Sequence, residues 1–206
     1  MCGRYSVLSE DDVIAVREII KEVSLKLARD ELGDYTTEER TEVFPTNHAP
    51  VVTSNGDELA FEHAQFGFTK WDGKGVIINV RSETVQEKSM FKKHVTSGRC
   101  IVPAGEYYEW KKSGRDKIKH LIKDEEGNLL FFTGLYREVP EGREFVIITK
   151  DAYGDVTDIH NRMPVILRAD QIELWLNGKL SPEDIVKMDF NALVVPCEEY
   201  VQMSLF

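Results

Sequence analysis

The feature that most constrains the fold is a succession of short apolar segments, separated by turn residues, that begins near Val43 and continues almost to the end of the chain. Segments of this length and composition indicate strands, and Asn55-Gly56-Asp57 between two of them indicates a hairpin. We expect strands over residues 51–53, 59–68, 76–80, 100–102, 107–110, 117–123, 129–135, 145–150 and 191–195. Because no strand–helix–strand rhythm accompanies them, the sequence predicts an α+β fold around a mainly antiparallel, barrel-like sheet.

Helices are expected to flank these strands. Ser9 followed by three acidic residues is typical of a helix N-cap, and apolar residues then recur at helical spacing, which predicts a helix over residues 10–29. The acidic residues 30–42 indicate a surface excursion. Ser82 is predicted to cap a helix that continues to about residue 95 and closes near Gly98. Short helices are also expected over residues 169–177 and from Ser181-Pro182 onward.

The length of 206 residues is sufficient for one domain with a sizeable core, so we expect a single domain over residues 1–206. The sequence contains no apolar run long enough to cross a membrane and no secretory signal pattern, which favours a cytoplasmic protein without a membrane partner. Three widely spaced cysteines do not indicate a disulfide framework, and their spacing relative to five scattered histidines does not indicate a structural metal site.

Net charge by itself argues against a nucleic-acid partner, because the formal charge is −10 and phosphate contacts supply most non-specific affinity for DNA. The charge is unevenly distributed, however. Residues 65–119 contain 12 Lys and Arg against six Asp and Glu, which gives +6, so the rest of the chain carries −16. This basic window is compatible with a nucleic-acid surface and equally with an ordinary solvated face.

Cys2 is the first candidate for chemistry, because removal of Met1 would leave a free α-amine beside the thiol of the same residue. An α-amine has a reference pKa of about 7.7–8.0, so a fraction of it is neutral and nucleophilic near neutral pH. A 1,2-aminothiol reacts with an aldehyde first through the amine, as an imine, and then through the thiol, as a five-membered thiazolidine ring. An internal cysteine cannot close that ring, but position 2 alone is also compatible with an arbitrary residue in a frayed terminus.

Three further segments carry side chains suited to proton transfer or DNA contact. Glu109 lies between two aromatic residues on an expected strand, where alternation places its carboxyl on the opposite face from both rings. Apolar surroundings would raise the pKa of that carboxyl and suit general acid–base catalysis. His160 precedes a strand-like segment, whereas Asn79 and Arg81 end another. The ordinary alternatives are an outward-facing Glu and a hydrogen-bonded structural His, and the Asn79–Arg81 segment by itself is a weak signal.

Taken together, these segments resemble the SRAP (SOS response-associated peptidase) family, over a stretch that extends from Cys2 to about Leu167. The ordered motifs are Met1-Cys2-Gly3-Arg4-Tyr5, Phe44-Pro45-Thr46 with Ala49-Pro50-Val51-Val52, Phe66-Gly67-Phe68 with Trp71, Asn79-Val80-Arg81-Ser82-Glu83-Thr84, Cys100-Ile101-Val102-Pro103-Ala104 with Tyr108-Glu109-Trp110, and His160-Asn161-Arg162-Met163-Pro164-Val165-Ile166-Leu167. Each motif is moderately specific, whereas their order behind a cysteine at position 2 is very specific. The chain departs from the usual pattern of this family at four positions. Phe44 replaces a small residue, Phe66 replaces Trp, Thr69 replaces Pro and Val80 replaces Ala.

The resemblance implies a single SRAP-type domain that senses abasic sites in single-stranded DNA and captures the open-chain sugar aldehyde as a thiazolidine DNA–protein crosslink. By position, Cys2 would be the nucleophile, and Asn79 would contact the open sugar or place the amine. Glu109 would be the general acid–base, and His160 would assist proton transfer. The implied DNA contacts are Arg4, Arg81 and Arg162 to phosphate, Pro45, Trp71 and Trp110 as stacking or wedging residues, and Ser82. No metal or organic cofactor is implied, and we expect a monomer that associates with the nucleoid when it is bound to DNA.

Two other functions stay open on sequence grounds, as does a preference for junctions between single- and double-stranded DNA. A thiol peptidase, in which His160 activates Cys2, would have the Met1–Cys2 bond of the chain itself as its obvious substrate. A non-enzymatic binder of single strands would use the basic window and form no covalent product.

Overall fold

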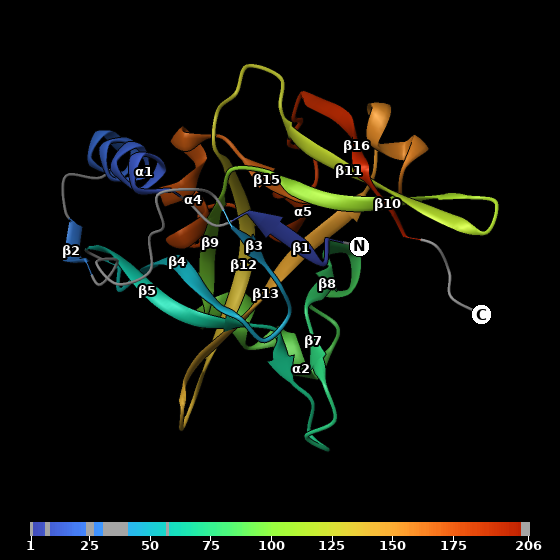
Figure 1. Ribbon diagram of the computed structural model, residues 1–206. Coiled ribbons are helices and arrows are strands. Elements are labelled where there is room, and N and C mark those ends of the chain that lie inside the picture. The colour runs from blue at the N-terminus through green and yellow to red at the C-terminus, as the bar shows by residue number, and fades with distance from the viewer. Residues whose placement is uncertain (1, 7–8, 24–26, 31–40, 57, 203–206) are drawn as a thin grey trace.

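The computed structural model describes residues 2–6, 9–23, 27–30, 41–56 and 58–202 of the chain. Five strands form a closed barrel in the order β13-β12-β9-β4-β5 (Figure 1). Their bounds are β4 (His48–Ser54), β5 (Leu59–Phe66), β9 (Arg99–Ala104), β12 (Leu130–Val139) and β13 (Gly142–Asp151). Neighbours along this order pair antiparallel, and the ring closes through a parallel pairing of Glu144 with Gln65 and Phe145 with Phe66. The predicted mainly antiparallel, barrel-like sheet is therefore confirmed.

A second sheet of five strands packs against the barrel. It is antiparallel throughout, in the order β16-β11-β10-β1-β3. The strands are β1 (Arg4–Ser6), β3 (Glu42–Val43), β10 (Tyr107–Ser113), β11 (Asp116–Asp124) and β16 (Ala192–Gln202). The start of the chain is thus paired on both sides, since Tyr5 lies opposite Tyr107 of β10 and opposite Val43 of β3.

Shorter strands extend the barrel sheet and form a projecting hairpin. They are β2 (Leu27–Asp30), β6 (Phe68–Thr69), β7 (Val76–Ile77), β8 (Asn79–Arg81), β14 (Arg162–Pro164) and β15 (Ile166–Leu167). Strand β8 runs parallel to β13 and brings Asn79 opposite Ile147. The expected strand over residues 76–80 is therefore two strands, because the chain leaves the β6–β7 hairpin at Ile77 and joins the barrel sheet at Asn79.

The helices of the described residues are shorter than the sequence predicts. They are α1 (Glu10–Val23), α2 (Ser89–Lys92), α3 (His94–Ser97), α4 (Ile172–Leu176) and α5 (Pro182–Ile185), with 3-10 turns at η2 (Ser82–Thr84), η3 (Gly154–Asp158) and η4 (Ala169–Gln171). The predicted end of the first helix at residue 29 is wrong, since Leu27–Asp30 forms β2 and pairs parallel with β5. Pairing with a barrel strand outweighs helical periodicity there. Most of the predicted acidic excursion lies outside the described residues.

The predicted helix from Ser82 to about residue 95 is also wrong. The segment is broken into η2, α2 and α3, and Arg81 rather than Ser82 occupies the N-cap of η2. Ser82 is buried and its hydroxyl bonds to the Glu83 carboxylate at 3.2 Å, so it does not cap the turn. Among the described residues, no helix is long and apolar enough to cross a membrane.

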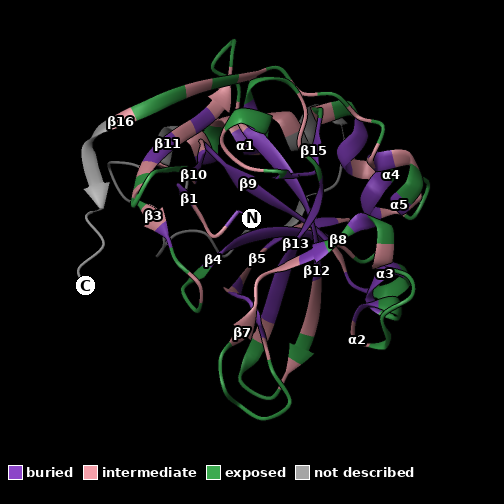
Figure 2. Cartoon of the chain, turned by 90° about the vertical axis from the view of Figure 1, so that its right-hand side faces the viewer, coloured by how far each residue is buried: buried purple, intermediate pink, exposed green. Residues whose placement is uncertain are grey.

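Alternation along the barrel strands divides the buried residues into two cores. Val52 and Phe131 face a helix-side core that includes residues of α1, α4 and α5, whereas Val51 and Phe132 face a sheet-side core shared with the five-stranded sheet. Figure 2 shows the buried barrel strands between these two layers. The sheet-side core also contains Cys2, so the start of the chain is part of the folded interior.

Edge-to-face aromatic contacts fix the five-stranded sheet on the barrel. The ring centroid of Tyr5 lies 5.6 Å from that of Phe66 and 5.9 Å from that of Phe132, and Tyr107 lies 5.9 Å from Phe132. Such pairs contribute about 0.5–1.5 kcal/mol beyond area burial. Tyr5 lies three residues after Cys2, and Tyr107 lies two residues before Glu109. These ring contacts therefore also position Cys2 and Glu109.

Gly134 tests how tightly the barrel is packed. A Cβ atom added at this position of β12 would lie 2.8 Å from the Cys100 sulfur and 3.0 Å from the Val146 carbonyl oxygen. We expect Gly134→Ala to lower the free energy of unfolding by about 1–3 kcal/mol, as overpacking usually does. Adding Cys100→Ala should recover part of the loss because it removes the sulfur. Urea unfolding of the two single variants and the double variant gives the coupling, and strict additivity would contradict this packing.

Candidate active site

Cys2 is held at a defined place rather than in a frayed terminus. Its side chain is fully buried, and its thiol contacts the Arg4 carbonyl oxygen at 3.8 Å. The Asn79 side-chain amide donates a hydrogen bond of 2.9 Å to the Cys2 carbonyl oxygen. Since Asn79 begins β8, the start of the chain is anchored to the barrel sheet as well as to β1. The structure thus brings together two residues that lie 77 positions apart in sequence.

Glu109 lies on the inner face of β10, as strand alternation predicts. Its residue exposure is 3%, whereas Trp110 on the opposite face is half-buried, so the alternative of an outward-facing Glu is wrong. Burial raises the pKa of the Glu109 carboxyl above its ordinary value. Burial and the negative charge of Glu109 also raise the pKa of the Cys2 thiol. The carboxyl and the thiol are therefore electrostatic neighbours in one apolar environment.

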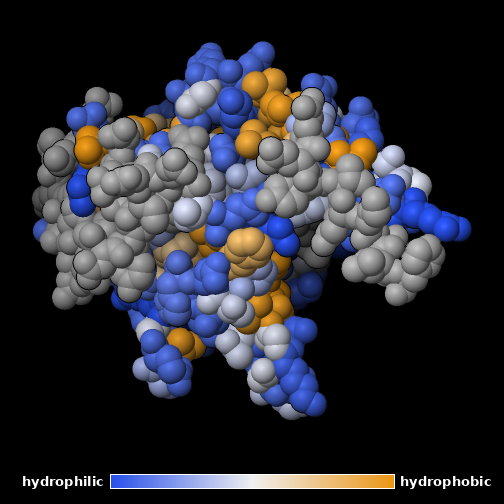
Figure 3. Space-filling model, in the orientation of Figure 1, coloured by the Kyte–Doolittle hydropathy of each residue, from blue (hydrophilic) through white to orange (hydrophobic). Residues whose placement is uncertain are grey.

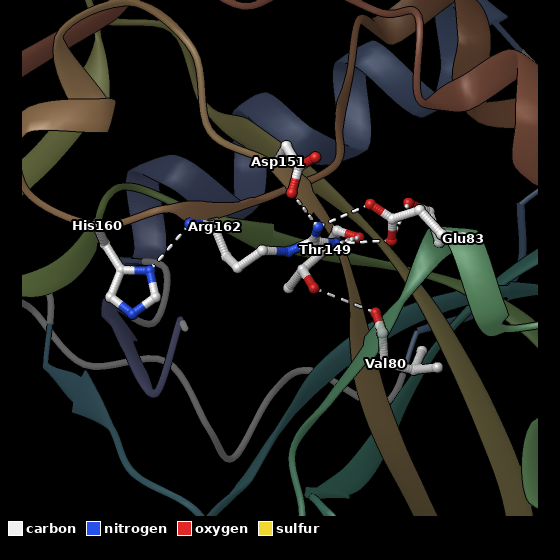
Figure 4. Close-up of polar contacts among 7 residues, drawn as sticks. Val80, Glu83, Thr149, Asp151, His160 and Arg162 are labelled. Atoms are coloured by element: carbon white, nitrogen blue, oxygen red, sulfur yellow. Dashed lines mark hydrogen bonds and ion pairs between the residues drawn. The ribbon is translucent and has the colours of Figure 1, made fainter.

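His160 lies beside this pair in the loop between η3 and β14. Its Nδ1 atom accepts a hydrogen bond of 2.9 Å from the backbone N–H of Arg162 (Figure 4). Because that backbone group can only donate, the neutral imidazole carries its proton on Nε2. A positive charge on this imidazole would oppose the effect of burial on the pKa of Glu109, so the two groups interact electrostatically.

Tyr107 joins the site, although no sequence motif singles it out. Burial, and then the charges of Cys2 and Glu109, raise the pKa of its phenol. Its hydroxyl is buried, and within the described part of the chain no hydrogen-bond partner reaches it. Strand alternation is the signal that could identify it, because residues 107 and 109 face the same side of β10.

Arg162 is buried beneath the site, and its guanidinium is bonded within the protein rather than exposed to a DNA phosphate. The residue is buried, and its guanidinium makes two parallel hydrogen bonds to Glu83, of 2.7 and 2.9 Å. It also contacts the Asp151 carboxylate at 2.5 Å and the Thr149 carbonyl oxygen at 2.7 Å (Figure 4). The ion pair lowers the pKa of Glu83 from 4.5 to about 2. Binding of a DNA phosphate by Arg162 would have to compete with these contacts, so that role stays a prediction.

The other residues predicted to contact DNA lie at different depths. Trp71 is 93% exposed in the turn between β6 and β7, and Arg81 is exposed at the end of β8. Pro45 is half-buried in the turn after β3. The Arg4 guanidinium lies 4.8 Å from the Trp110 ring centroid, on the outer face of the five-stranded sheet. Figure 3 shows that the face seen in Figure 1 mixes hydrophilic surface with hydrophobic patches.

Ser82 is the exception among these residues. It is buried and bonded to Glu83, so it belongs to the Arg162 network rather than to the exposed surface. Among the described residues, no group of three His, Cys, Asp or Glu side chains is placed to hold a metal ion.

A cavity of about 770 Å³ lies elsewhere, between α1, the turn that follows β11 and the segment that precedes β16. None of the predicted site residues lines it. The chemistry suggested by Cys2, Glu109 and His160 is that of a buried thiol beside a buried carboxyl. Such an arrangement can move a proton between a nucleophile and a bound substrate.

Comparison with known proteins adds a family context. A family model described as "SOS response associated peptidase (SRAP)" matches residues 1–202. The chain is 34% identical over 198 residues to the abasic site processing protein YoqW of Bacillus subtilis, a match that covers 91% of this chain and 85% of that protein. It is 27% identical to the abasic site processing protein YedK of Escherichia coli, with coverage of 89% and 83%. A solved structure from Bacteroides thetaiotaomicron superposes with a TM-score of 0.74 at 25% identity and covers 94% of this chain and 91% of that one.

The Arg162–Glu83 pair predicts a specific pH dependence of stability. Because the pKa of Glu83 is lower in the folded chain than in the unfolded one, its contribution is complete above about pH 4.5 and is lost as the pH falls towards about 2. We expect Glu83→Gln to cost about 1 kcal/mol at pH 7, allowing for solvent screening of a half-exposed carboxylate. The difference from wild type should shrink at pH 3 in urea unfolding. Glu87→Gln, an exposed carboxylate that Arg162 does not contact, is the control, and an equal difference at both pH values would contradict the assignment.

Proposed function

Because the chain belongs to the SRAP (SOS response-associated peptidase) family, we propose that it processes abasic sites in single-stranded DNA, and that Cys2 links covalently to the lesion once Met1 is removed. The observation that carries the proposal is a chain of contacts among four separate segments: Asn79 hydrogen-bonds to Cys2, Glu109 interacts electrostatically with the Cys2 thiol, and His160 interacts electrostatically with Glu109. Relatives that are named abasic site processing proteins support the same substrate class.

The proposed reaction joins the α-amine and the thiol of Cys2 to one carbon atom. The open-chain sugar of an abasic site presents an aldehyde at C1′. The neutral amine adds to that carbon, and the resulting hydroxyl leaves as water with a proton from a neighbouring acid, which leaves a protonated imine. The Cys2 sulfur then adds to the same carbon while its proton passes to the conjugate base of that acid, and the nitrogen keeps its own proton. The product is a thiazolidine, one water is released, and neither oxidant nor metal is consumed.

Glu109 is the group best placed to donate and accept these protons. Since burial raises its pKa, the carboxyl keeps its proton to a higher pH than an exposed glutamate and can donate it to the departing hydroxyl. The carboxylate left behind can accept the proton of the Cys2 thiol, which needs a base because its own pKa is raised. Glu109 thereby returns to its starting state after both steps.

His160 and Asn79 support the same reaction in different ways. With Nδ1 occupied by the Arg162 backbone, His160 has Nε2–H as the donor for a sugar hydroxyl, during ring opening or during reversal of the crosslink. Asn79 holds the Cys2 backbone through its amide N–H. Its side-chain oxygen is buried and, within the described part of the chain, has no hydrogen-bond partner, so it can accept from the freed amine.

The proposed DNA path lies over exposed and half-buried surface residues. Arg4 and Arg81 supply charge for phosphates, and Trp71, Trp110 and Pro45 supply apolar surface for bases without sequence preference. Arg162 and Ser82 act from beneath that surface by keeping β8 and the His160 loop in place. We propose a monomer acting on single strands, with junctions as a second substrate to be compared.

A thiol peptidase is less well supported by the electrostatics. Cysteine peptidases depend on a thiolate, which requires a lowered thiol pKa. Burial and the charge of Glu109 raise the pKa of the Cys2 thiol instead. Hydrolysis of other chains is therefore not favoured, and Met1–Cys2 cleavage remains the one peptidase reaction that the proposed function needs.

Substitution of Cys2 tests the covalent step. We expect wild-type protein and Cys197→Ala to form a denaturation-stable adduct with an abasic single-stranded oligonucleotide, whereas Cys2→Ala forms none. Intact-mass measurement should give the protein without Met1, plus the oligonucleotide, minus one water. An adduct in Cys2→Ala, or an adduct on protein that retains Met1, would rule out the aminothiol chemistry. Binding without any adduct in all three proteins would support the non-enzymatic binder instead.

Substitution of Glu109 tests the proton transfer. We expect Glu109→Gln to slow single-turnover crosslinking by about 100-fold or more, because positioned acid–base groups contribute roughly 10²–10⁴-fold. In the wild type the rate should fall as the pH rises through the raised pKa of Glu109, and this limb should vanish in the variant. Glu106→Gln, which alters a carboxylate bonded to the Tyr108 hydroxyl, is the matched control. A Glu109→Gln rate equal to that of the control would remove Glu109 from the mechanism.

A further inference from the structure

Phe44 is an exposed aromatic residue that belongs to a mixed cationic and aromatic cluster. The residue is 40% exposed, and the Arg4 guanidinium lies 4.5 Å from its ring centroid. The same guanidinium lies 4.8 Å from the ring centroid of Trp110. We call Phe44, Arg4 and Trp110 the stacking cluster. It unites three segments of the five-stranded sheet on the face opposite to Glu109.

The turn that presents Phe44 is rigid. The Asn47 N–H donates to the Phe44 carbonyl oxygen at 3.0 Å, and the Phe44 N–H donates to the Asn47 side-chain oxygen at 2.9 Å. Thr46 adopts a φ of 75°, a strained conformation for a β-branched residue. Its N–H donates to the Phe66 carbonyl oxygen at 2.8 Å, which ties the turn to β5. Backbone strain of this kind persists where the surroundings impose it, and it concentrates at functional positions.

Glu42 stabilises the stacking cluster through ion pairs. Glu42 contacts the Arg4 guanidinium at 3.7 Å and forms an ion pair with the buried Lys119. Lys119 itself lies over the Tyr108 ring, 4.0 Å from its centroid. The guanidinium of Arg4 is therefore held by one carboxylate and two rings, which fixes the positions of the rings relative to one another.

The stacking cluster lies next to the reactive centre. Arg4 is two residues from Cys2, so their Cα atoms are at most about 7 Å apart. Trp110 directly follows Glu109 on β10. Phe44 follows β3 beside the Arg4 end of β1, so a nucleotide adjacent to a lesion bound at Cys2 has to cross this end of the sheet to reach the exposed ring of Phe44 on its outer face. Apolar exposure beside a fixed cation fits the chemistry of a single-stranded nucleic acid, whose bases stack and whose phosphates are anionic.

We propose that Phe44 is a base-stacking residue, whose exposed ring binds the face of a nucleobase next to the lesion while Arg4 beside it attracts the neighbouring phosphate. The proposal rests on the proposed function for the location of the lesion. The exposed ring of Phe44 adds binding surface to that of Pro45, Trp71 and Trp110. It gives affinity without sequence preference.

The test measures binding of undamaged single-stranded DNA by fluorescence anisotropy. Stacking of one base on one aromatic ring is typically lost with a drop of roughly 5- to 150-fold in affinity. We expect Phe44→Ala and Phe44→Leu to raise the Kd about tenfold, and Phe44→Tyr to stay within about twofold of wild type, since only tyrosine keeps the π face. Ile14→Ala removes an exposed apolar side chain of α1 and is the matched control, with no expected change.

The outcomes separate this inference from the proposed chemistry. Unchanged binding in Phe44→Ala, or equal weakening in Phe44→Ala and Phe44→Tyr at an unchanged Tm, overturns the stacking role. With abasic DNA, Phe44→Ala should raise the half-saturating DNA concentration and leave the maximal crosslinking rate unchanged. If the wild type forms no adduct but Phe44→Ala still weakens binding, the crosslinking proposal fails while the stacking role stands.

Discussion

The contact on which the site depends is the packing of Tyr5 and Tyr107 against Phe132 of the barrel. These rings hold the first strand of the chain and β10 against the sheet-side core, where free N-terminal residues would otherwise fray. Cys2 and Glu109 lie within a few residues of the two tyrosines and so acquire fixed positions. Reactivity at the start of a chain requires such anchoring, because a mobile aminothiol would meet its proton acceptor only occasionally.

A second constraint is the buried Arg162 network beneath His160. Arg162 bridges Glu83, next to β8, and Asp151, at the end of β13, while its backbone N–H orients the imidazole. Burial of a guanidinium is costly unless its N–H donors are satisfied. Here the Arg162 guanidinium donates four hydrogen bonds, to two carboxylates and one carbonyl oxygen. One residue therefore couples the position of Asn79 to the position and tautomer of His160.

The electrostatics of the centre favour neutral reactants. Burial disfavours the thiolate of Cys2 and the carboxylate of Glu109, and the proximity of the two groups strengthens the effect on the thiol. A site of this kind suits addition to a carbonyl carbon with concerted proton movement better than it suits a preformed thiolate. The outer face of the same sheet has the opposite character, since Arg4 and Lys119 are stabilised there by aromatic rings and by Glu42.

The sequence by itself determined the fold class, the antiparallel pairing of β4 with β5, the separation of Glu109 from Tyr108 and Trp110, and the family resemblance, because alternation and turn chemistry are local properties. It could not determine that Leu27–Asp30 pairs with β5 or that residues 82–95 break into short turns, since partners far along the chain outweigh local propensity. The burial of Arg162, the participation of Tyr107 and the contact of Phe44 with Arg4 were likewise decided only by the tertiary structure. Each depends on which side chains the barrel brings within a few ångströms, and no local pattern encodes that distance.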